Sequence, residues 1–184
     1  MAAASAQTKT NLEIINELIS MSVSQVDSVI GGKRTFFLTV ETSPGFEILK
    51  PNVYESFNKN GDTLKSSMDG TGKSVTLTII SSKVEYKNSY SDGIFGGTML
   101  EREVSVNGSC LITGNDKIIR TMPFHRTYLD TIKLSDIAAL ENQSLPFTQS
   151  KLPPLPLLSN FWEPIIVVGT LIVTVILLFT VRSK

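Results

Sequence analysis

The sequence predicts an α+β domain followed by a single apolar helix. Three observations lead to this prediction: a helical stripe near the N-terminus, a series of β-branched segments in the middle, and a long run without charge near the end. We expect the domain to occupy residues 10–144. Its sheet should be mostly antiparallel, with about five or six strands and helices packed on one face, because most strand-like segments follow one another directly.

The first third of the domain reads as helix, strand and helix. Apolar residues recur at helical spacing over 10–30, where Thr10 and Glu13 suit a capping box and Gly31 suits a stop. Residues 34–41 are β-branched and aromatic, as expected of a strand. Residues 51–61 open with a proline and close with a glycine, which predicts a short helix.

The second part of the domain is rich in strand signals. The segments that alternate apolar and polar residues are 74–87, 99–113, 117–122 and 127–134. Asn107 and Gly108 together form the dipeptide most typical of a hairpin turn, so we expect the chain to reverse there. Arg102 shares a strand face with apolar neighbours, so it should lie across the sheet and pair with a carboxylate. Ser135 is expected to cap a short helix that ends near Asn142.

Residues 145–161 contain four of the eight prolines, and we expect an extended spacer there. A transmembrane helix is then predicted over 162–181, because Ile165–Val181 are seventeen residues without a charge and thirteen of them are Ile, Val, Leu or Phe. Their transfer to lipid favours insertion by about 5 kcal/mol. The residues expected to anchor the helix are Trp162, Ile165, Val181, Arg182 and Lys184.

The side of the membrane on which the domain lies is open to two interpretations. Arg182 and Lys184 form a basic tail, 182–184, which the positive-inside tendency places in the cytoplasm, with the domain outside. Ala4, Ser5 and Ala6 resemble the end of a signal peptide, so residues 1–9 are either the remnant of a cleavage region or a disordered start. If Met1 is the true start, the protein is instead tail-anchored with its domain in the cytosol.

Composition argues against several classes of function. The chain holds 17 basic and 17 acidic residues and no basic stripe, which disfavours nucleic-acid binding. One cysteine and one histidine are too few for a zinc site. A catalytic pair of Cys110 and His125 has no supporting motif. We therefore expect no catalytic residue, no metal site and no cofactor.

The sequence thus favours a non-enzymatic, single-pass membrane protein that acts as a subunit, scaffold or assembly factor in the cell envelope. Its partners would be the lipid bilayer and another membrane or envelope protein. Candidate contacts are Ile94 and Phe95 in a glycine-rich loop over 88–98, and a small-residue face of the apolar helix at Gly169, Thr170 and Thr174. The alternatives are a tail-anchored cytosolic adaptor and a small membrane-bound hydrolase.

Overall fold

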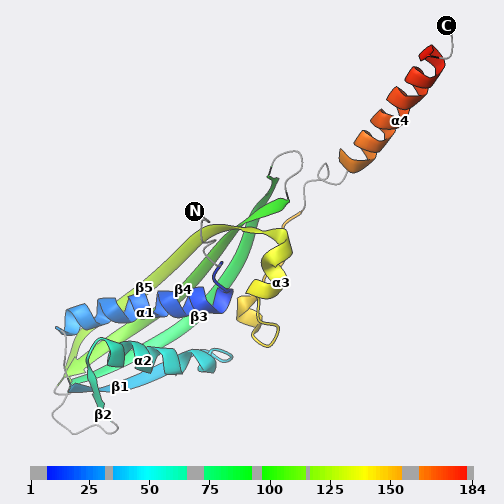
Figure 1. Cartoon of the computed structure of the whole chain (residues 1–184). Helices are drawn as coiled ribbons and strands as arrows, with labels where there is room; N and C mark the ends of the chain where they lie inside the picture. The colour runs from blue at the N-terminus through cyan, green and yellow to red at the C-terminus, as the bar shows by residue number, and fades with distance from the viewer. Residues whose placement is uncertain are drawn as a thin grey trace.

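The computed structural model has an α+β fold, in which helices cover one face of a five-stranded sheet (Figure 1). It describes residues 8–31, 35–65, 73–92, 97–114, 117–154 and 162–181. The elements in chain order are α1 (Asn11–Ile30), β1 (Thr35–Thr42), η1 (Glu47–Leu49), α2 (Lys50–Lys59), β2 (Thr63–Lys65), β3 (Lys73–Ser91), β4 (Thr98–Gly114), β5 (Lys117–Lys133), η2 (Leu134–Asp136), α3 (Ile137–Leu140), η3 (Pro146–Thr148) and α4 (Trp162–Val181).

The predicted N-terminal helix is confirmed together with both of its ends. The Thr10 hydroxyl accepts a hydrogen bond from the Glu13 amide, and the Glu13 carboxylate accepts one from the Thr10 amide at 2.7 Å. Gly31 ends α1 with φ at 96°, a left-handed conformation that glycine adopts without strain. The capping box and the glycine therefore set the ends of α1 by local chemistry alone.

The sheet is mixed, so the prediction of a mostly antiparallel sheet is wrong. The strand order is β2-β1-β3-β4-β5. β1 pairs in parallel with β2 on one side and with β3 on the other, while β3, β4 and β5 pair antiparallel. The helix α2 between β1 and β2 is the kind of crossover that returns a chain to the same direction. β2 has only three residues, too few to show a periodicity in the sequence.

The predicted hairpin turn at Asn107 and Gly108 is also wrong, because both residues lie inside β4. Among the described glycines, positive φ angles occur at Gly31, Gly45 and Gly61 and not at Gly108, although the hairpin turn favoured by this dipeptide needs positive φ. A Cβ atom on Gly108 would lie 2.3 Å from both the Phe124 ring and the Thr78 carbonyl oxygen. A glycine is therefore required at position 108 of β4, because Phe124 of β5 and the Thr78 backbone of β3 both pack closely against it.

The last two predicted strands form one strand, β5, which runs through Pro123. β5 is an edge strand, and a proline is tolerated there because an outward N–H is not needed for pairing. Ser135 makes no capping hydrogen bond, and the predicted helix after it is reduced to η2 and the four residues of α3. The glycine-rich loop is shorter than expected, since 88–91 belong to β3 and Thr98 begins β4.

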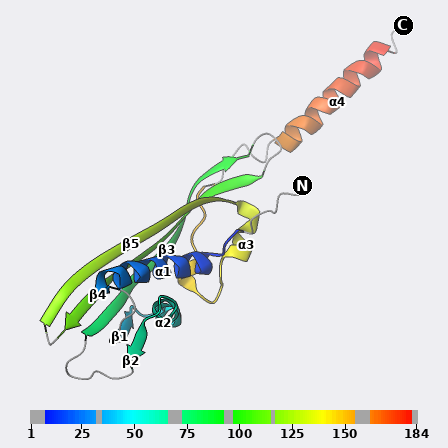
Figure 2. The same ribbon diagram turned by 60° about the vertical axis from the view of Figure 1, so that its left-hand side comes forward.

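The core lies between the sheet and two helices that cover the same face. α1 packs over β4 and β5, and α2 packs beside it over β1 and β2 (Figure 2). The fully buried side chains of this layer include Ile14, Ile15, Phe36, Phe57, Leu77 and Leu100. Phe36 and Phe57 meet edge to face, with 5.4 Å between their ring centroids. The opposite face of β3 and β4 carries half-buried hydroxyl side chains, including Ser74 and Thr113, whose oxygens lie 2.5 Å apart.

α4 forms where the sequence predicts a helix, but the expected transmembrane helix is not found. Over the described residues, no helix has both the length and the apolarity that a membrane crossing requires. The uncharged run Ile165–Val181 is about 25 Å long at 1.5 Å per residue, while the hydrocarbon layer is about 30 Å thick.

We predict that Gly108→Ala lowers the free energy of unfolding by about 1–3 kcal/mol, because the added methyl group overlaps a backbone carbonyl that cannot move independently. Chemical unfolding of the full chain in detergent, followed by circular dichroism, measures the change. Gly97→Ala is the matched control, since a Cβ atom on Gly97 has no neighbour within 4 Å. Equal stability of the two variants would contradict the packing role of Gly108.

Candidate functional site

Arg102 is the most unusual side chain of the domain, because it is a charged residue with no exposed surface. It lies on β4 and faces the core, as its apolar neighbours predicted. Its Nε donates to Asp130 Oδ1 at 2.8 Å, and one terminal nitrogen donates to Asp130 Oδ2 at 2.5 Å. This two-point pairing with a carboxylate on β5 confirms the expectation that Arg102 lies across the sheet and pairs with an acid.

The same guanidinium also binds the start of α1. Its other terminal nitrogen donates to the Lys9 carbonyl at 2.9 Å and to Asn11 Oδ1 at 2.8 Å. The Asn11 amide nitrogen then donates to the Tyr86 hydroxyl at 3.0 Å and to the Thr148 carbonyl at 2.7 Å. This polar network (Arg102, Asp130, Asn11, Tyr86 and Thr148) joins α1, β3, β4, β5 and η3 at one point.

The chemistry of the network is structural. Arginine keeps its charge in proteins, so Arg102 cannot exchange a proton with a substrate. Burial raises the pKa of Tyr86 to about 12, which keeps its hydroxyl neutral. Arg102, Asn11 and Thr148 have no exposed surface, so these three side chains cannot meet a ligand.

His125 and Cys110 are not brought together. His125 is on β5 and hydrogen-bonds to Asn107 Oδ1 at 2.5 Å and to the Thr127 hydroxyl at 3.1 Å, on the outer face of the sheet. Cys110 points into the core with no exposed surface, and burial raises its pKa to about 12. The sheet separates the thiol from the imidazole, and the thiol is not ionised at neutral pH.

Residues 141–154, which we call the strap, fold back along β3 and hold a groove open against it. Thr148 is buried, and its hydroxyl bonds with the Asn142 amide at 3.0 Å and with the Leu145 carbonyl at 2.8 Å. The Ser89 hydroxyl donates to the Pro154 carbonyl at 2.7 Å. Asn11 holds the strap at the Thr148 carbonyl and Ser89 holds it at Pro154, so the strap is fixed to the domain at two points.

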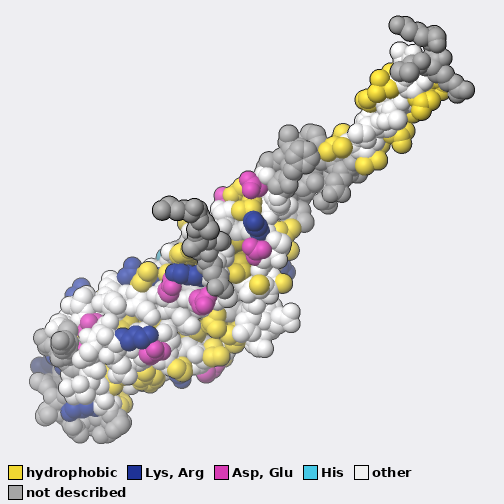
Figure 3. Space-filling view, in the orientation of Figure 1, with side chains coloured by type: hydrophobic (Ala, Val, Ile, Leu, Met, Phe, Trp, Pro, Cys, Tyr) yellow, Lys and Arg dark blue, Asp and Glu magenta, His cyan; other side chains and the backbone are white. Residues whose placement is uncertain are grey.

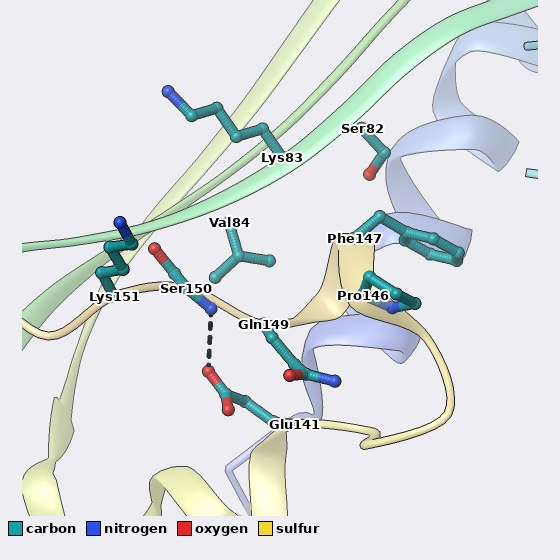
Figure 4. A pocket seen from close by; sticks show the side chains of 9 residues that line it. All are labelled: Ser82, Lys83, Val84, Glu141, Pro146, Phe147, Gln149, Ser150 and Lys151. Carbon is teal, nitrogen blue, oxygen red and sulfur yellow. Dashed lines mark hydrogen bonds between the residues drawn. The ribbon is translucent and has the colours of Figure 1, made fainter. Parts of the chain in front are cut away.

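The groove has a volume of about 530 Å³ and lies between the middle of the strap and residues 82–84 of β3 (Figure 4). Val84, Pro146 and Phe147 supply its apolar surface, and Glu141 and Lys151 stand at its rim. Glu141 Oε1 accepts a hydrogen bond from the Ser150 amide at 3.1 Å. The structure thus has an open groove with apolar and charged walls next to the buried network.

The residues that the sequence selected lie elsewhere. Ile165, Gly169, Thr170 and Thr174 are on α4, where the two threonine hydroxyls bond back to carbonyls one turn earlier. A Cβ atom on Gly169 would have no neighbour within 4 Å. Ile94, Phe95, Arg182, Lys184 and the side chains of Trp162 and Val181 lie outside the described residues. The anchoring and contact roles of all these residues stay predictions.

Sequence reasoning missed Asn11, Tyr86 and Thr148 as members of the network, and it missed the groove. One signal was present for Asn11. It stands one turn before Ile15 and two turns before Ile19, so it is a polar residue on the apolar face of α1. A polar side chain in that position needs a buried partner. Tyr86 and Thr148 have no comparable local pattern.

Within the described residues, no group of three or more His, Cys, Asp or Glu side chains could hold a metal ion. Glu101 and Glu103 both lie on the outer face of β4, where Glu103 pairs with Lys87 and Glu101 accepts a hydrogen bond from Asn88 at 2.7 Å. The expectations of no metal site and no cofactor stay predictions.

No protein-family model matches the chain, and no curated protein matches it. Two similar solved structures are lipoproteins. Rare lipoprotein B from Shewanella oneidensis has 16% identity and a TM-score of 0.35, with 53% of this chain and 68% of that chain covered. A minor lipoprotein from Acinetobacter baumannii has 13% identity and a TM-score of 0.39, with 70% and 87% covered. Likeness at this level assigns neither a family nor a function to the chain.

We predict that Asp130→Ala lowers the free energy of unfolding by roughly 3–5 kcal/mol, because it leaves the buried Arg102 without its carboxylate. Urea unfolding of the full chain in detergent is the measurement. Glu103→Ala is the control, since it removes the half-buried partner of the exposed Lys87 on the outer face of the sheet and should cost less than about 1 kcal/mol. A small effect at Asp130 would mean that the ion pair is not needed for the fold.

We also predict that the domain loses stability between pH 9 and pH 12. The pKa values of Cys110 and Tyr86 are raised from 9.0 and 10.0 to about 12 in the folded chain, so unfolding releases protons in this window. Each such proton changes the free energy of unfolding by up to about 1.4 kcal/mol per pH unit. Cys110→Ala should flatten the decline between pH 9 and pH 10 in urea unfolding curves, and an unchanged slope would contradict this assignment.

Proposed function

We propose that the chain is a non-enzymatic, membrane-attached protein whose α+β domain binds another membrane protein as a subunit or assembly factor. α4 supplies the attachment by lying in lipid. The domain supplies a rigid surface held in one shape by the Arg102 network.

The exposure of α4 carries the proposal. Its large apolar side chains are 42–73% exposed on all sides of the helix, from Ile165 to Phe179. Hydrophobic side chains line α4 in the space-filling view, whereas charged side chains are spread over the domain (Figure 3). Covering one such side chain is worth roughly 1.5–3 kcal/mol. A helix with this surface is therefore unfavourable in water and favourable among acyl chains.

The arrangement of the domain's reactive side chains supports a binding role over catalysis. Cys110 and His125 lie on opposite sides of the sheet, which disfavours the hydrolase alternative. The buried charge of Arg102 is neutralised by Asp130, and the guanidinium points into the core. The described polar groups thus serve to hold strands and helices together.

In this proposal α4 attaches the chain to lipid but does not cross the bilayer. The positive-inside argument from Arg182 and Lys184 applies to a helix that crosses, so the two expected orientations do not enter the proposal. The envelope protein and the cytosolic adaptor share the same chemistry: an apolar helix in lipid and a domain that binds protein. Gly169 remains the proposed position for contact with a second helix, because its open surface lets another backbone approach closely.

We predict that the full chain stays in the membrane pellet after an alkaline carbonate wash, and that Val173→Arg with Leu177→Arg releases it. Both positions are more than half exposed on α4. Each change replaces a large apolar side chain, whose burial is worth roughly 1.5–3 kcal/mol, with a charge, so the two changes should lower partitioning by at least roughly 100-fold.

The matched control places two arginines on the domain, at Ile80 and Leu129, which are 52% and 68% exposed. This variant should remain in the pellet. Release of the unmodified chain by carbonate, or retention of the α4 variant, would overturn attachment through α4.

A further inference from the structure

The middle of β3 has a free edge. β1 pairs with β3 as far as Thr42 and Ile79, and beyond that point β4 is the one strand among the described residues that pairs with β3. Register shifts lie between Ile79 and Ser81 and between Lys87 and Ser89. Residues 81–87 are therefore a regular strand segment about 23 Å long at 3.3 Å per residue. Every second residue of such an edge turns its N–H and C=O groups outward without a strand partner.

The strap runs along this edge without pairing to it. In the described part of the chain, no backbone hydrogen bond joins the strap to β3. The middle of the strap bonds away from the sheet: the Ser150 amide donates to Glu141, and the Gln149 side chain donates to the Asn142 and Gln143 carbonyls. Asn11 fixes the strap at Thr148 and Ser89 fixes it at Pro154. The strap thus forms the second wall of a slot that is fixed at both ends.

Two features of the groove in this slot point to a ligand. Val84, Pro146 and Phe147 provide an apolar surface. The Ser82 side chain, 7% exposed, lines the groove and points toward the strap, and its hydroxyl has no hydrogen-bond partner among the described residues (Figure 4). A buried hydroxyl without a partner costs free energy, so a group that binds it would be favoured.

The charges at the groove favour an acidic ligand. Lys83 pairs with Glu85 at 2.5 Å, and Glu141 already accepts from Ser150. Lys151 is an exposed cation that forms no ion pair with the described residues. A carboxylate on the ligand would therefore find a partner at Lys151.

We propose that this slot binds an extended polypeptide segment of a partner protein, in which apolar and acidic side chains alternate, by adding it as a strand to residues 81–87 of β3. The inference rests on the proposed binding function and names its site. A row of backbone groups at strand spacing matches another extended backbone. Alternation places apolar side chains against Val84 and Phe147 on one face of the added strand and carboxylates near Lys151 on the other.

The edge of the sheet formed by β5 is less suited to strand addition. β5 contains Pro123, which lacks an N–H, whereas residues 81–87 of β3 contain no proline. Proline is one of the devices that keep edge strands from pairing. Among the described residues, no segment runs along the edge of β5 as the strap runs along β3. β5 therefore serves as a control edge within the same molecule.

The test uses the full chain in lipid nanodiscs and, as the probe, an acetylated heptapeptide in which valine alternates with aspartate. Amide hydrogen exchange should slow by at least roughly 10-fold in residues 81–87 when the probe is in excess, and it should not change in 117–123 of β5. A heptapeptide of the same composition with N-methylated alternate residues should give no protection, because it cannot donate the strand hydrogen bonds.

Two variants test the walls of the slot. Ser150→Trp should fill the groove, and Lys151→Glu should repel the probe, each weakening binding by roughly 10-fold or more in fluorescence polarisation. Lys133→Glu makes the same charge change at the end of β5 and should leave binding unchanged. Unaltered thermal unfolding of each variant confirms that the fold is intact.

The proposal is overturned if the probe gives no protection at millimolar concentration, if residues 117–123 of β5 are protected as strongly as residues 81–87, or if Ser150→Trp and Lys151→Glu bind as the unmodified chain does. These outcomes would leave attachment through α4 standing, since that attachment is read from the carbonate wash. Conversely, if the carbonate wash released the chain while the probe still protected residues 81–87, attachment through α4 would be wrong and the proposed binding slot would stand.

Discussion

The burial of Arg102 is the constraint on which the rest of the domain depends. A guanidinium with no exposed surface is tolerated in a core only if its charge and its N–H groups are satisfied there. Asp130 supplies the charge, and Lys9 and Asn11 supply the remaining acceptors. These partners come from β5 and from the start of α1. The position of α1 on the sheet is therefore set by hydrogen-bond geometry as well as by its apolar stripe.

The same network explains why a groove exists beside β3. Asn11 has one amide group, and it uses the carbonyl oxygen for Arg102 and the nitrogen for Tyr86 and Thr148. Thr148 is thus held against the start of α1. The strap on either side of Thr148 therefore runs beside β3 without pairing with it. A segment that paired fully with β3 would close the groove. The middle of the strap instead hydrogen-bonds to the strap's own first residues, 141–143, and leaves the edge of β3 available.

The sequence predicted features that depend on near neighbours and failed where a residue has two possible roles. The cap of α1 and its glycine stop were correct, because each rests on contacts within one turn. The pairing of Arg102 with an acid was also correct, because its apolar neighbours show that it faces the core. Asn107 and Gly108 were misread as a turn. A glycine serves a tight turn and a close strand contact equally well, and the contact with Phe124 that distinguishes them comes from another strand.

The amino-acid sequence alone determined the α+β class, the helix α1, most of the strand positions and the apolar character of α4. Each of these features depends on a local periodicity of apolar residues or on local composition. The tertiary structure decided the parallel pairing of β1, the members of the Arg102 network and the slot along β3. The physical reason is distance along the chain. Asn11 and Thr148 are 137 residues apart and meet through one side-chain hydrogen bond, an interaction that leaves no periodic pattern in either segment.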